Sequence, residues 1–513
     1  MLAVQTPTHV DIRSSTTLGL IHSIQIPARF RGANVRWSPA SAGQSKPRRI
    51  VLYNDSGARV ENIVGRSGHA VIDRGSGGLG KIINVEFGRT DDELLVFQEF
   101  GSKVTLWNLR TARSVDIKDP KYASSKGFAF RPGSQHFTLL SRPGPQDVLT
   151  MHALNSYTVI WSVALPTTDA QGLAWSHDGR FVAIWDTPSI GYKVHIYTAA
   201  GDLYRIYSGD QTDGEVELGV RSVSWSPSSD YLAIGGYDRR VRLLSTRTFS
   251  PLMYLDHTTP IQLPASSISQ IWHEELSGSS NRSYVSATAP FSPPTANSGS
   301  PADTLKEAGT SLLSFSPCGT YLATRHDATP TTAWIWAVRG ARLAAVLAHH
   351  APLRLLAWRP TRPPTLLLQC AHDDPALYLW EGADVAPVVL PVAPLARAPK
   401  APAQWLAPRG EAAGMAPPSR KPAVLFGDAR SAVVVWPQGR DGESEELPPA
   451  SAGEDGDESL DSVFEALTGV GRSPFKAGVD GDTEILVSDV LDETTQVVDD
   501  TFVGRRGQFV GSY

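Results

Sequence analysis

The chain has 513 residues and a formal net charge of −5 at pH 7. Its two cysteines, Cys318 and Cys370, cannot form a disulfide framework, which is typical of a reducing compartment. The N-terminus has no basic region followed by an apolar core, and no segment approaches the roughly 18 consecutive apolar residues that a membrane span needs. We therefore expect a soluble, intracellular protein.

An aromatic residue recurs ahead of a turn and a β-rich run at eight points of the chain. The best copy reads SVSWSPSSDYLAIGGYDRRVRLLST, residues 222–246. The steps between successive aromatics are 50, 43, 45, 50, 90, 43 and 47 residues, a period that is typical of the four-stranded blades of WD40-type propellers. The eight marker aromatics are Trp37, Phe87, Phe130, Trp175, Trp225, Phe315, Trp358 and Trp405.

These repeats predict an all-β, WD40-type β-propeller over residues 10–436. Residues 10–26 have the pattern of the third and fourth strands of a first repeat whose opening half is missing, so the count is eight repeats plus a half repeat. That count exceeds the usual maximum of eight blades. Two smaller propellers, or one ring with an irregular blade, would both account for it.

Within the best copy, polar side chains are expected to tie turns to strands. Asp238 falls in the turn between the second and third strands, and His257 and His349 fall in the turn that leads into the next blade. Serines precede proline in the turns at Ser38 and Ser226, and again at Ser316, where a folding role explains the hydroxyl. We expect a structural hydrogen-bond network from these residues.

Two segments interrupt the repeat. The doubled step after Trp225 marks an insertion at residues 258–310, rich in Ser, Thr, Pro and Ala, which we expect to be a structureless loop of a kind that is often functional. A species-specific expansion is an equal alternative. Residues 385–422 are rich in Ala and Pro and lengthen the link around Trp405.

Residues 437–513 are predicted to be a disordered acidic tail, because Gly, Glu, Asp, Ser and Pro replace the apolar residues there. Residues 441–513 hold 18 acidic and 4 basic residues, which leaves 43 basic and 34 acidic residues in the body. A helical spacing of apolar residues at 460–467 indicates a docking helix or a chance cluster. Ser473 lies in a Ser-Pro-x-Lys sequence that suits mitotic phosphorylation, or it is a chance match. The body has no basic stripe with interleaved aromatics, so we expect no nucleic-acid partner.

Three candidate sites fail on their context. GSGGLGK at residues 75–81 matches GxGxxG, but it opens a strand instead of a helix, so no helix N-terminus could hold a phosphate. Trp185-Asp186 is the one Trp-Asp dipeptide, and it ends a second strand instead of a third. A metal site could be imagined from His349, His350, His372, Asp373 and Asp374, whose spacing fits no compact zinc signature. We therefore predict no catalytic, cofactor-binding or metal-binding residues, no cofactor and no enzyme activity.

Several strings are more specific than generic repeats. Residues 174–209 read AWSHDGRFVAIWDTPSIGYKVHIYTAAGDLYRIYSG, and residues 323–336 read ATRHDATPTTAWIW. With the repeats between them, these strings resemble the WD repeat-containing protein 8 family of centrosomes and spindle poles, in its fungal-type form. The resemblance extends over residues 10–436 and includes the insertion after the Trp225 repeat.

The resemblance implies a non-catalytic scaffold at spindle poles and microtubule-organising centres. Such a protein would bind a coiled-coil spindle-anchoring partner and tether microtubule minus ends, together with a minus-end-directed kinesin. The expected location is the cytoplasm and cytoskeleton, at the spindle pole body or centrosome, with no membrane partner. The alternative is a substrate-recognition or assembly subunit of a ubiquitin ligase or a nuclear regulatory complex, because fold alone does not separate these roles.

Overall fold

The computed structural model describes residues 1–439, apart from 16–17, 40–48, 64–67, 74–79, 155, 210–217, 264–268, 278–280, 296–308, 362, 373–375, 384, 393–402, 407–420 and 428–431, and it also describes residues 470–471. The apolar cluster predicted at 460–467 and Ser473 lie outside the described residues, so both stay predictions. Among the described residues, no helix is long and apolar enough to span a membrane.

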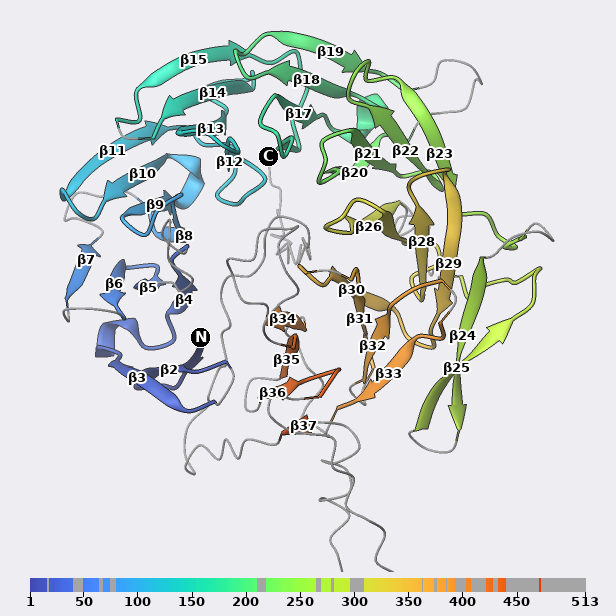
Figure 1. Cartoon of the computed structure of the whole chain (residues 1–513). Helices are drawn as coiled ribbons and strands as arrows, with labels where there is room; N and C mark the ends of the chain where they lie inside the picture. Colours follow the sequence, from blue (N-terminus) through green and yellow to red (C-terminus); the bar gives the residue numbers. More distant parts are fainter. Residues whose placement is uncertain are drawn as a thin grey trace, which may run out of the picture.

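Nine sheets, antiparallel apart from one added strand in blade 7, follow one another around a ring, so the fold is an all-β, WD40-type β-propeller with nine blades (Figure 1). We number the blades in chain order. In blades 2 to 9 the first strand of each sheet lies toward the centre of the ring and the last strand lies at the outer rim.

Blades 2 to 5 each contain four strands in sequential order. They are β4 (Asn34–Trp37), β5 (Arg49–Asn54), β6 (Gly57–Asn62) and β7 (His69–Asp73); β8 (Ile82–Phe87), β9 (Glu93–Gln98), β10 (Lys103–Asn108) and β11 (Arg113–Lys118); β12 (Phe128–Phe130), β13 (His136–Ser141), β14 (Val148–Ala153) and β15 (Val159–Ala164); β16 (Gly172–Trp175), β17 (Phe181–Trp185), β18 (Val194–Thr198) and β19 (Leu203–Tyr207).

Blades 6 to 9 repeat this order. They are β20 (Val220–Trp225), β21 (Tyr231–Gly236), β22 (Arg240–Ser245) and β23 (Pro251–Asp256); β26 (Thr310–Phe315), β27 (Tyr321–His326), β28 (Thr332–Ala337) and β29 (Arg342–Ala348); β30 (Leu353–Trp358), β31 (Leu366–Cys370), β32 (Ala376–Trp380) and β33 (Val388–Pro391); β34 (Gln404–Leu406), β35 (Ala423–Gly427), β36 (Ala432–Val435) and β37 (Val470–Gly471). Short 3-10 helices occur at η1 (Ala28–Phe30), η2 (Glu99–Gly101) and η3 (Pro188–Ile190).

Blade 1 has three strands, β1 (Leu2–Gln5), β2 (His9–Arg13) and β3 (Leu20–Gln25). The two strands predicted at residues 10–26 are therefore present, and β1 adds a third that the repeat pattern did not indicate. Leu2 of β1 packs in one hydrophobic cluster with Leu425 and Val434 of blade 9 and with Trp436, which directly follows β36. This contact between the first and last blades closes a single ring, so the alternative of two smaller propellers is wrong.

The marker aromatics lie between blades. Seven of the eight are buried, and Phe130 is half-buried. The indole N–H of Trp225 donates to the carbonyl of Ala174 in blade 5 at 3.0 Å. In the same way, Trp358 donates to the carbonyl of Ser314 at 3.0 Å. Each acceptor immediately precedes the marker aromatic of the previous blade. Trp405 donates in the same way to the carbonyl of Ala357, whereas Trp175 donates to the hydroxyl of Thr138.

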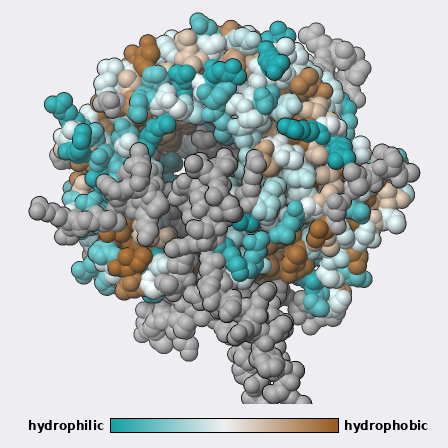
Figure 2. Space-filling model, in the orientation of Figure 1, coloured by the Kyte–Doolittle hydropathy of each residue, from teal (hydrophilic) through white to brown (hydrophobic). Residues whose placement is uncertain are grey.

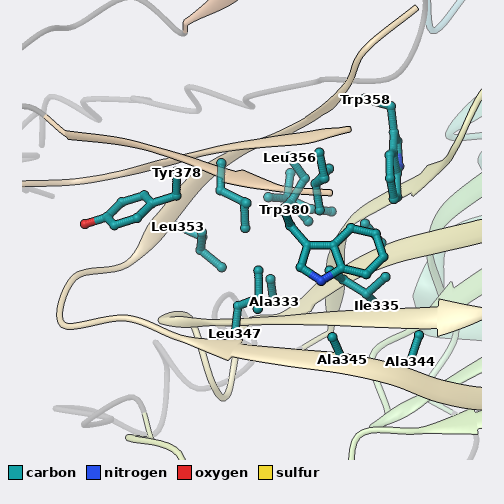
Figure 3. Packing of buried hydrophobic residues seen from close by; sticks show 14 of the residues in the cluster. Ala333, Ile335, Ala344, Ala345, Leu347, Leu353, Leu356, Trp358, Tyr378 and Trp380 are labelled. Atoms are coloured by element: carbon teal, nitrogen blue, oxygen red, sulfur yellow. The ribbon is translucent and has the colours of Figure 1, made fainter. Parts of the chain in front are cut away.

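Large apolar side chains fill the space between neighbouring sheets, as blades 7 and 8 illustrate. Trp358 and Trp380 of blade 8 lie close together over Ile335 and Ala344 of blade 7 (Figure 3). The ring centroids of the two tryptophans are 6.1 Å apart, with an interplanar angle of 78°. Because each sheet buries both faces against its neighbours, no blade has a core of its own.

The insertion departs from the sequence-based expectation of a structureless loop. Within it, β24 (Gln270–Ser277) and β25 (Asn281–Ala287) form an antiparallel hairpin. β24 also pairs in parallel with β29, so blade 7 becomes part of a six-stranded sheet, and the hairpin stands outside the ring (Figure 1). The prediction failed because a composition rich in Ser and Thr conceals β-forming runs such as QIWHEELS.

Replacement of Trp225 tests the contact that repeats around the ring. Trp225→Ala leaves a cavity between blades 5 and 6 and removes the bond to Ala174, and we expect the free energy of unfolding to fall by about 3 to 5 kcal/mol. Chemical denaturation followed by tryptophan fluorescence measures the change. Leu218→Ala, at a side chain that is 42% exposed in the loop before β20, is the control and should change stability by less than about 0.5 kcal/mol. Equal stability of both variants would place Trp225 outside the core.

Candidate functional site

Serine hydroxyls hold the turns between the first and second strands of several blades. The hydroxyls of Ser226 and Ser316 accept hydrogen bonds from the backbone N–H groups of Tyr231 and Tyr321, each at 3.0 Å. Ser38 accepts from Arg49 N–H at 3.1 Å. All three serines are buried, which confirms the folding role that was predicted for them.

Asp238 joins the turn of blade 6 to blade 5. Its carboxylate accepts hydrogen bonds from the N–H of Arg240 at 3.3 Å and from the Tyr192 hydroxyl at 2.7 Å. The guanidinium of Arg242 pairs with the same carboxylate at 2.8 Å and lies 4.1 Å over the Tyr192 ring. The predicted turn role of Asp238 is confirmed, and the contact with Tyr192 extends it across the blade boundary.

His257 connects blade 6 to the core of blade 7. Its Nδ1 lies 3.2 Å from the carbonyl of Arg239, which can only accept, so Nδ1 carries the proton. Nε2 therefore accepts from the Thr324 hydroxyl at 2.8 Å, and that hydroxyl in turn accepts from the indole N–H of Trp336 at 2.9 Å. This chain of three side chains fixes the turn, the second strand and the third strand of blade 7 together.

Blade 8 lacks the hydroxyl that would complete the same chain. By strand register, Leu368 occupies the position of Thr324, since Leu368 pairs with Leu356 as Thr324 pairs with Leu313. His349 donates from Nδ1 to the carbonyl of Thr331 at 3.1 Å, and its Nε2 lies 2.6 Å from the hydroxyl of Tyr284. The inserted hairpin therefore supplies the partner that blade 8 does not provide.

Glu274 on β24 is the centre of the contact between the hairpin and blade 8. The carboxylate is fully buried and accepts hydrogen bonds from the Tyr378 hydroxyl at 2.6 Å, the N–H of His350 at 2.8 Å and the Arg282 guanidinium at 2.8 Å. His372 lies 2.7 Å from the Tyr378 hydroxyl. We call Glu274, Arg282, Tyr284 and Tyr378, with the three histidines His349, His350 and His372, the hairpin anchor.

The ionisable groups of the hairpin anchor have pKa values far from neutral pH, so their protonation states do not change near pH 7. Burial acts to raise the pKa of Glu274, but hydrogen bonds from Tyr378, His350 N–H and Arg282 outweigh it and lower the pKa to about 2. Burial raises the pKa of the Tyr378 hydroxyl. Burial also lowers the pKa of His349 to about 4. At neutral pH the carboxylate is charged while the tyrosine and histidine are neutral, which suits a structural anchor better than a proton-transfer site.

The metal hypothesis for the histidines does not gain support from their positions. His349, His350 and His372 are brought together, but around tyrosine and glutamate oxygens that already bond to one another. Asp373 and Asp374 lie outside the described residues. In the part of the chain that the structure describes, no group of three or more His, Cys, Asp or Glu residues could hold a metal ion.

The structure describes part of the glycine-rich motif and all of the Trp-Asp dipeptide. Residues 80 and 81 of the glycine-rich motif lead directly into β8 at Ile82, and the rest of the motif lies outside the described residues. Trp185 ends β17, the second strand of blade 5, as predicted. Asp186 accepts hydrogen bonds from the N–H groups of Thr168 and Asp169 at 2.8 and 2.7 Å, and it therefore holds the loop that enters the blade.

Sequence reasoning does not identify Glu274, Arg282 and Tyr284, because the composition of the insertion predicts a structureless loop. A signal was present: two runs with aromatic and β-branched residues, residues 270–277 and 281–287, flank a short Gly- and Ser-containing link. That arrangement is typical of a β-hairpin. No local pattern, however, could place the hairpin beside blade 8.

Loss of the carboxylate should free the hairpin without opening the ring. Glu274→Gln leaves the half-buried guanidinium of Arg282 without a carboxylate, and we expect a loss of about 3 kcal/mol of local stability. Hydrogen exchange of β24 and β25 amides, followed by mass spectrometry, should quicken accordingly. Glu275→Gln, at the exposed neighbouring residue, is the matched control and should exchange like the parent. Equal protection in both variants would contradict the anchoring role of Glu274.

Buried neutral histidines should make the protein sensitive to acid. Burial lowers the pKa of His257 to about 3 and that of His349 to about 4, from an ordinary value of 6.5. Below pH 6.5 the unfolded chain takes up protons that the folded protein cannot, so the free energy of unfolding falls as pH falls. By pH 5 the loss is about 2 kcal/mol for each histidine.

Denaturation at pH 7.5 and 5.0 measures this loss. His349→Gln should reduce the difference between the two pH values by about 2 kcal/mol. His22→Gln, at an exposed position, is the control and should leave the difference unchanged. A difference that persists in full in His349→Gln would assign the acid sensitivity to other groups.

Comparison with known proteins agrees with the fold. The family model for the WD domain, G-beta repeat, matches residues 203–245, from β19 through β22. Mouse WD repeat-containing protein WRAP73 is 30% identical over 345 residues, which cover 63% of this chain and 71% of the mouse protein. The uncharacterized WD repeat-containing protein C32H8.09 of Schizosaccharomyces pombe is 28% identical over 371 residues, which cover 70% of this chain and 72% of that protein.

Solved structures show weaker likeness. The crystal structure of Sqt1 from Chaetomium thermophilum aligns with 74% of this chain and 85% of its own, at 14% identity and a TM-score of 0.44. The sequence relationship to the mouse protein is the stronger finding. The chain therefore belongs to the family of WD repeat-containing proteins that includes mouse WRAP73, a class of propellers that are typically non-catalytic scaffolds for protein interactions.

Proposed function

We propose that this protein is a non-catalytic scaffold of spindle poles and microtubule-organising centres, a fungal-type member of the WD repeat-containing protein 8 family. It binds a coiled-coil anchoring protein and, together with a minus-end-directed kinesin, tethers microtubule minus ends. Its place in the cell is the cytoplasm and cytoskeleton, at the spindle pole body or centrosome.

The observation that carries the proposal is the resemblance of two strings, residues 184–197 and 323–336. The first spans β17 and β18 of blade 5, and the second spans β27 and β28 of blade 7. They contain Tyr192 and Thr324, whose side chains bond to residues of the neighbouring blade 6. The resemblance therefore concerns how this ring is assembled as well as its repeat pattern.

The outer surface of the ring suits a scaffold. Hydrophobic residues occur at several points along the rim among hydrophilic ones (Figure 2). Exposed aromatic and aliphatic side chains of this kind are the anchors of protein interfaces. The hairpin of β24 and β25 adds a projecting edge to the same rim.

Deletion of the gene tests the proposal. Cells without the protein should show spindle minus ends that are detached from the pole or protrude past it, and a fluorescently tagged protein should concentrate at poles in mitosis. Affinity purification from mitotic cells should recover a coiled-coil protein and a kinesin. Normal pole focusing in a clean deletion, or recovery of cullin or histone-modifying subunits in place of the spindle proteins, would overturn the proposal.

A further inference from the structure

The outer strands of blades 4, 5 and 6 present large hydrophobic side chains to solvent. An exposed apolar surface that continues from blade to blade marks an interaction site more strongly than scattered single residues do. The exposed fractions are 56% for Val159 and 48% for Ile160 in β15; 45% for Leu203, 50% for Tyr204 and 40% for Ile206 in β19; and 57% for Leu252 and 42% for Tyr254 in β23.

β19 is the most exposed of these strands. Four consecutive residues, from Leu203 to Ile206, are exposed, and Tyr207 alone is buried. The sheet of blade 5 ends at β19, so within the described part of the chain no strand lies along its outer edge. A strand edge with solvent-facing backbone groups and large apolar side chains is a template for another strand.

The exposed surface continues from blade 5 to blade 6. The ring of Tyr204 lies 5.8 Å from that of Phe249 in the turn before β23, and its hydroxyl donates to the carbonyl of Arg247 at 3.4 Å. Leu252 and Tyr254 follow in β23. We call the exposed apolar residues of these two strands, Leu203, Tyr204, Ile206, Leu252 and Tyr254, the rim patch.

Blade 7 shows what an added strand on such an edge looks like. There β24 pairs in parallel with β29, from Gln270 opposite Ala345 to His273 opposite Ala348. Ser269 continues the contact by donating to the carbonyl of Leu343 at 2.5 Å. The outer edge of a blade in this ring therefore accepts a further strand.

The edges of blades 5 and 7 have the same local geometry. Each outer strand carries one extra residue near its start, Tyr204 in β19 and Ala344 in β29, which has no partner in the neighbouring strand. In blade 7 this residue is small and 7% exposed, whereas Tyr204 is large and 50% exposed. The same extra residue occurs in the uncovered outer strands β3, β15 and β23, so covered and uncovered edges of this ring share this geometry.

The charges beside the rim patch indicate the chemistry of a partner segment that would pair with β19. Arg205 and Arg247 are exposed, and no described carboxylate lies within ion-pair distance of either. Asp202, in the turn before β19, forms no ion pair with them. On β23, by contrast, Asp256 already pairs with Arg240 at 2.6 Å. Among the described residues, therefore, a segment laid along β19 would meet two positive charges that have no ion-pair partner, next to an apolar surface.

We propose that β19 is a docking edge for an extended partner segment of alternating hydrophobic and acidic residues, which adds to blade 5 as β24 adds to blade 7. Backbone pairing along the edge supplies affinity, and the rim patch with Arg205 and Arg247 supplies selectivity. The inference rests on the proposed scaffold function only in requiring a partner.

A labelled peptide tests the edge directly. The probe is fluorescein-labelled (Glu-Val)4, titrated with the purified full chain and followed by anisotropy, with (Lys-Val)4 as the charge-inverted probe. We expect saturable binding of the acidic peptide alone. Arg205→Glu and Arg247→Glu should each weaken it at least about fivefold. The matched control is Arg113→Glu, at an exposed arginine that begins β11, the outer strand of blade 3, and it should bind like the parent.

Hydrogen exchange separates strand addition from other modes of contact. Amides of residues 203–207 should exchange more slowly in the peptide complex, while docking of a helix on the side chains would leave them unchanged and overturn the proposal. Absence of saturable binding, or equal loss in Arg113→Glu, would also overturn it. So would a dimer of the free chain that Leu203→Asp dissociates, because the occupant would then be a second copy. The experiment involves no spindle, so its failure is distinguishable from failure of the pole function.

Discussion

The packing of a marker aromatic between neighbouring blades is the interaction on which the rest of the ring depends. A four-stranded sheet is twisted and buries both faces, so neighbouring blades pack closely only at one relative orientation and one position along the ring axis. The indole N–H of Trp225 fixes that relation by bonding to a backbone carbonyl at 3.0 Å, and Trp405 does the same with Ala357. The indole of Trp175 instead donates to the hydroxyl of Thr138 at 3.1 Å, and three of the eight markers are phenylalanines, so packing is the contact that all the markers share.

The period of the marker aromatics predicted the propeller because it follows directly from this contact. What the period could not show is how the ring closes, since closure depends on Leu2 of β1 meeting Leu425 and Trp436 of the last blade. Residues more than 400 positions apart in the sequence leave no local pattern of their meeting. The contacts of the hairpin anchor could not be predicted for the same reason, since Glu274 and Tyr378 become neighbours only in the folded ring, where blades 7 and 8 lie side by side.

Polar residues in this ring divide between local and long-range roles, and that division explains which of them were found. Ser226, Ser316 and Asp238 bond backbone groups within five residues, so turn chemistry alone identifies them. His349 was placed correctly in its turn, but its partner Tyr284 comes from an inserted segment. Tyr284 takes this place because blade 8 has Leu368 where blade 7 has the hydroxyl of Thr324, a difference whose consequence is visible only in three dimensions.

The leucine at position 368 also leaves a buried hydrogen-bond donor of blade 8 without a partner, and the hairpin does not supply one. In blade 7 the Thr324 hydroxyl serves both His257 and the indole N–H of Trp336, whereas in blade 8 the buried Nε1 of Trp380, at the position of Trp336, has no hydrogen-bond partner among the described residues. A buried donor without a partner costs about 1 to 3 kcal/mol. The large apolar contact of Trp380 with Trp358 and Tyr321 offsets that cost. Aromatic packing and the inserted hairpin therefore stabilise blade 8, whereas a chain of hydrogen bonds stabilises the corresponding part of blade 7. Because blade 8 bonds to Glu274 and Tyr284, the hairpin is a structural part of the ring.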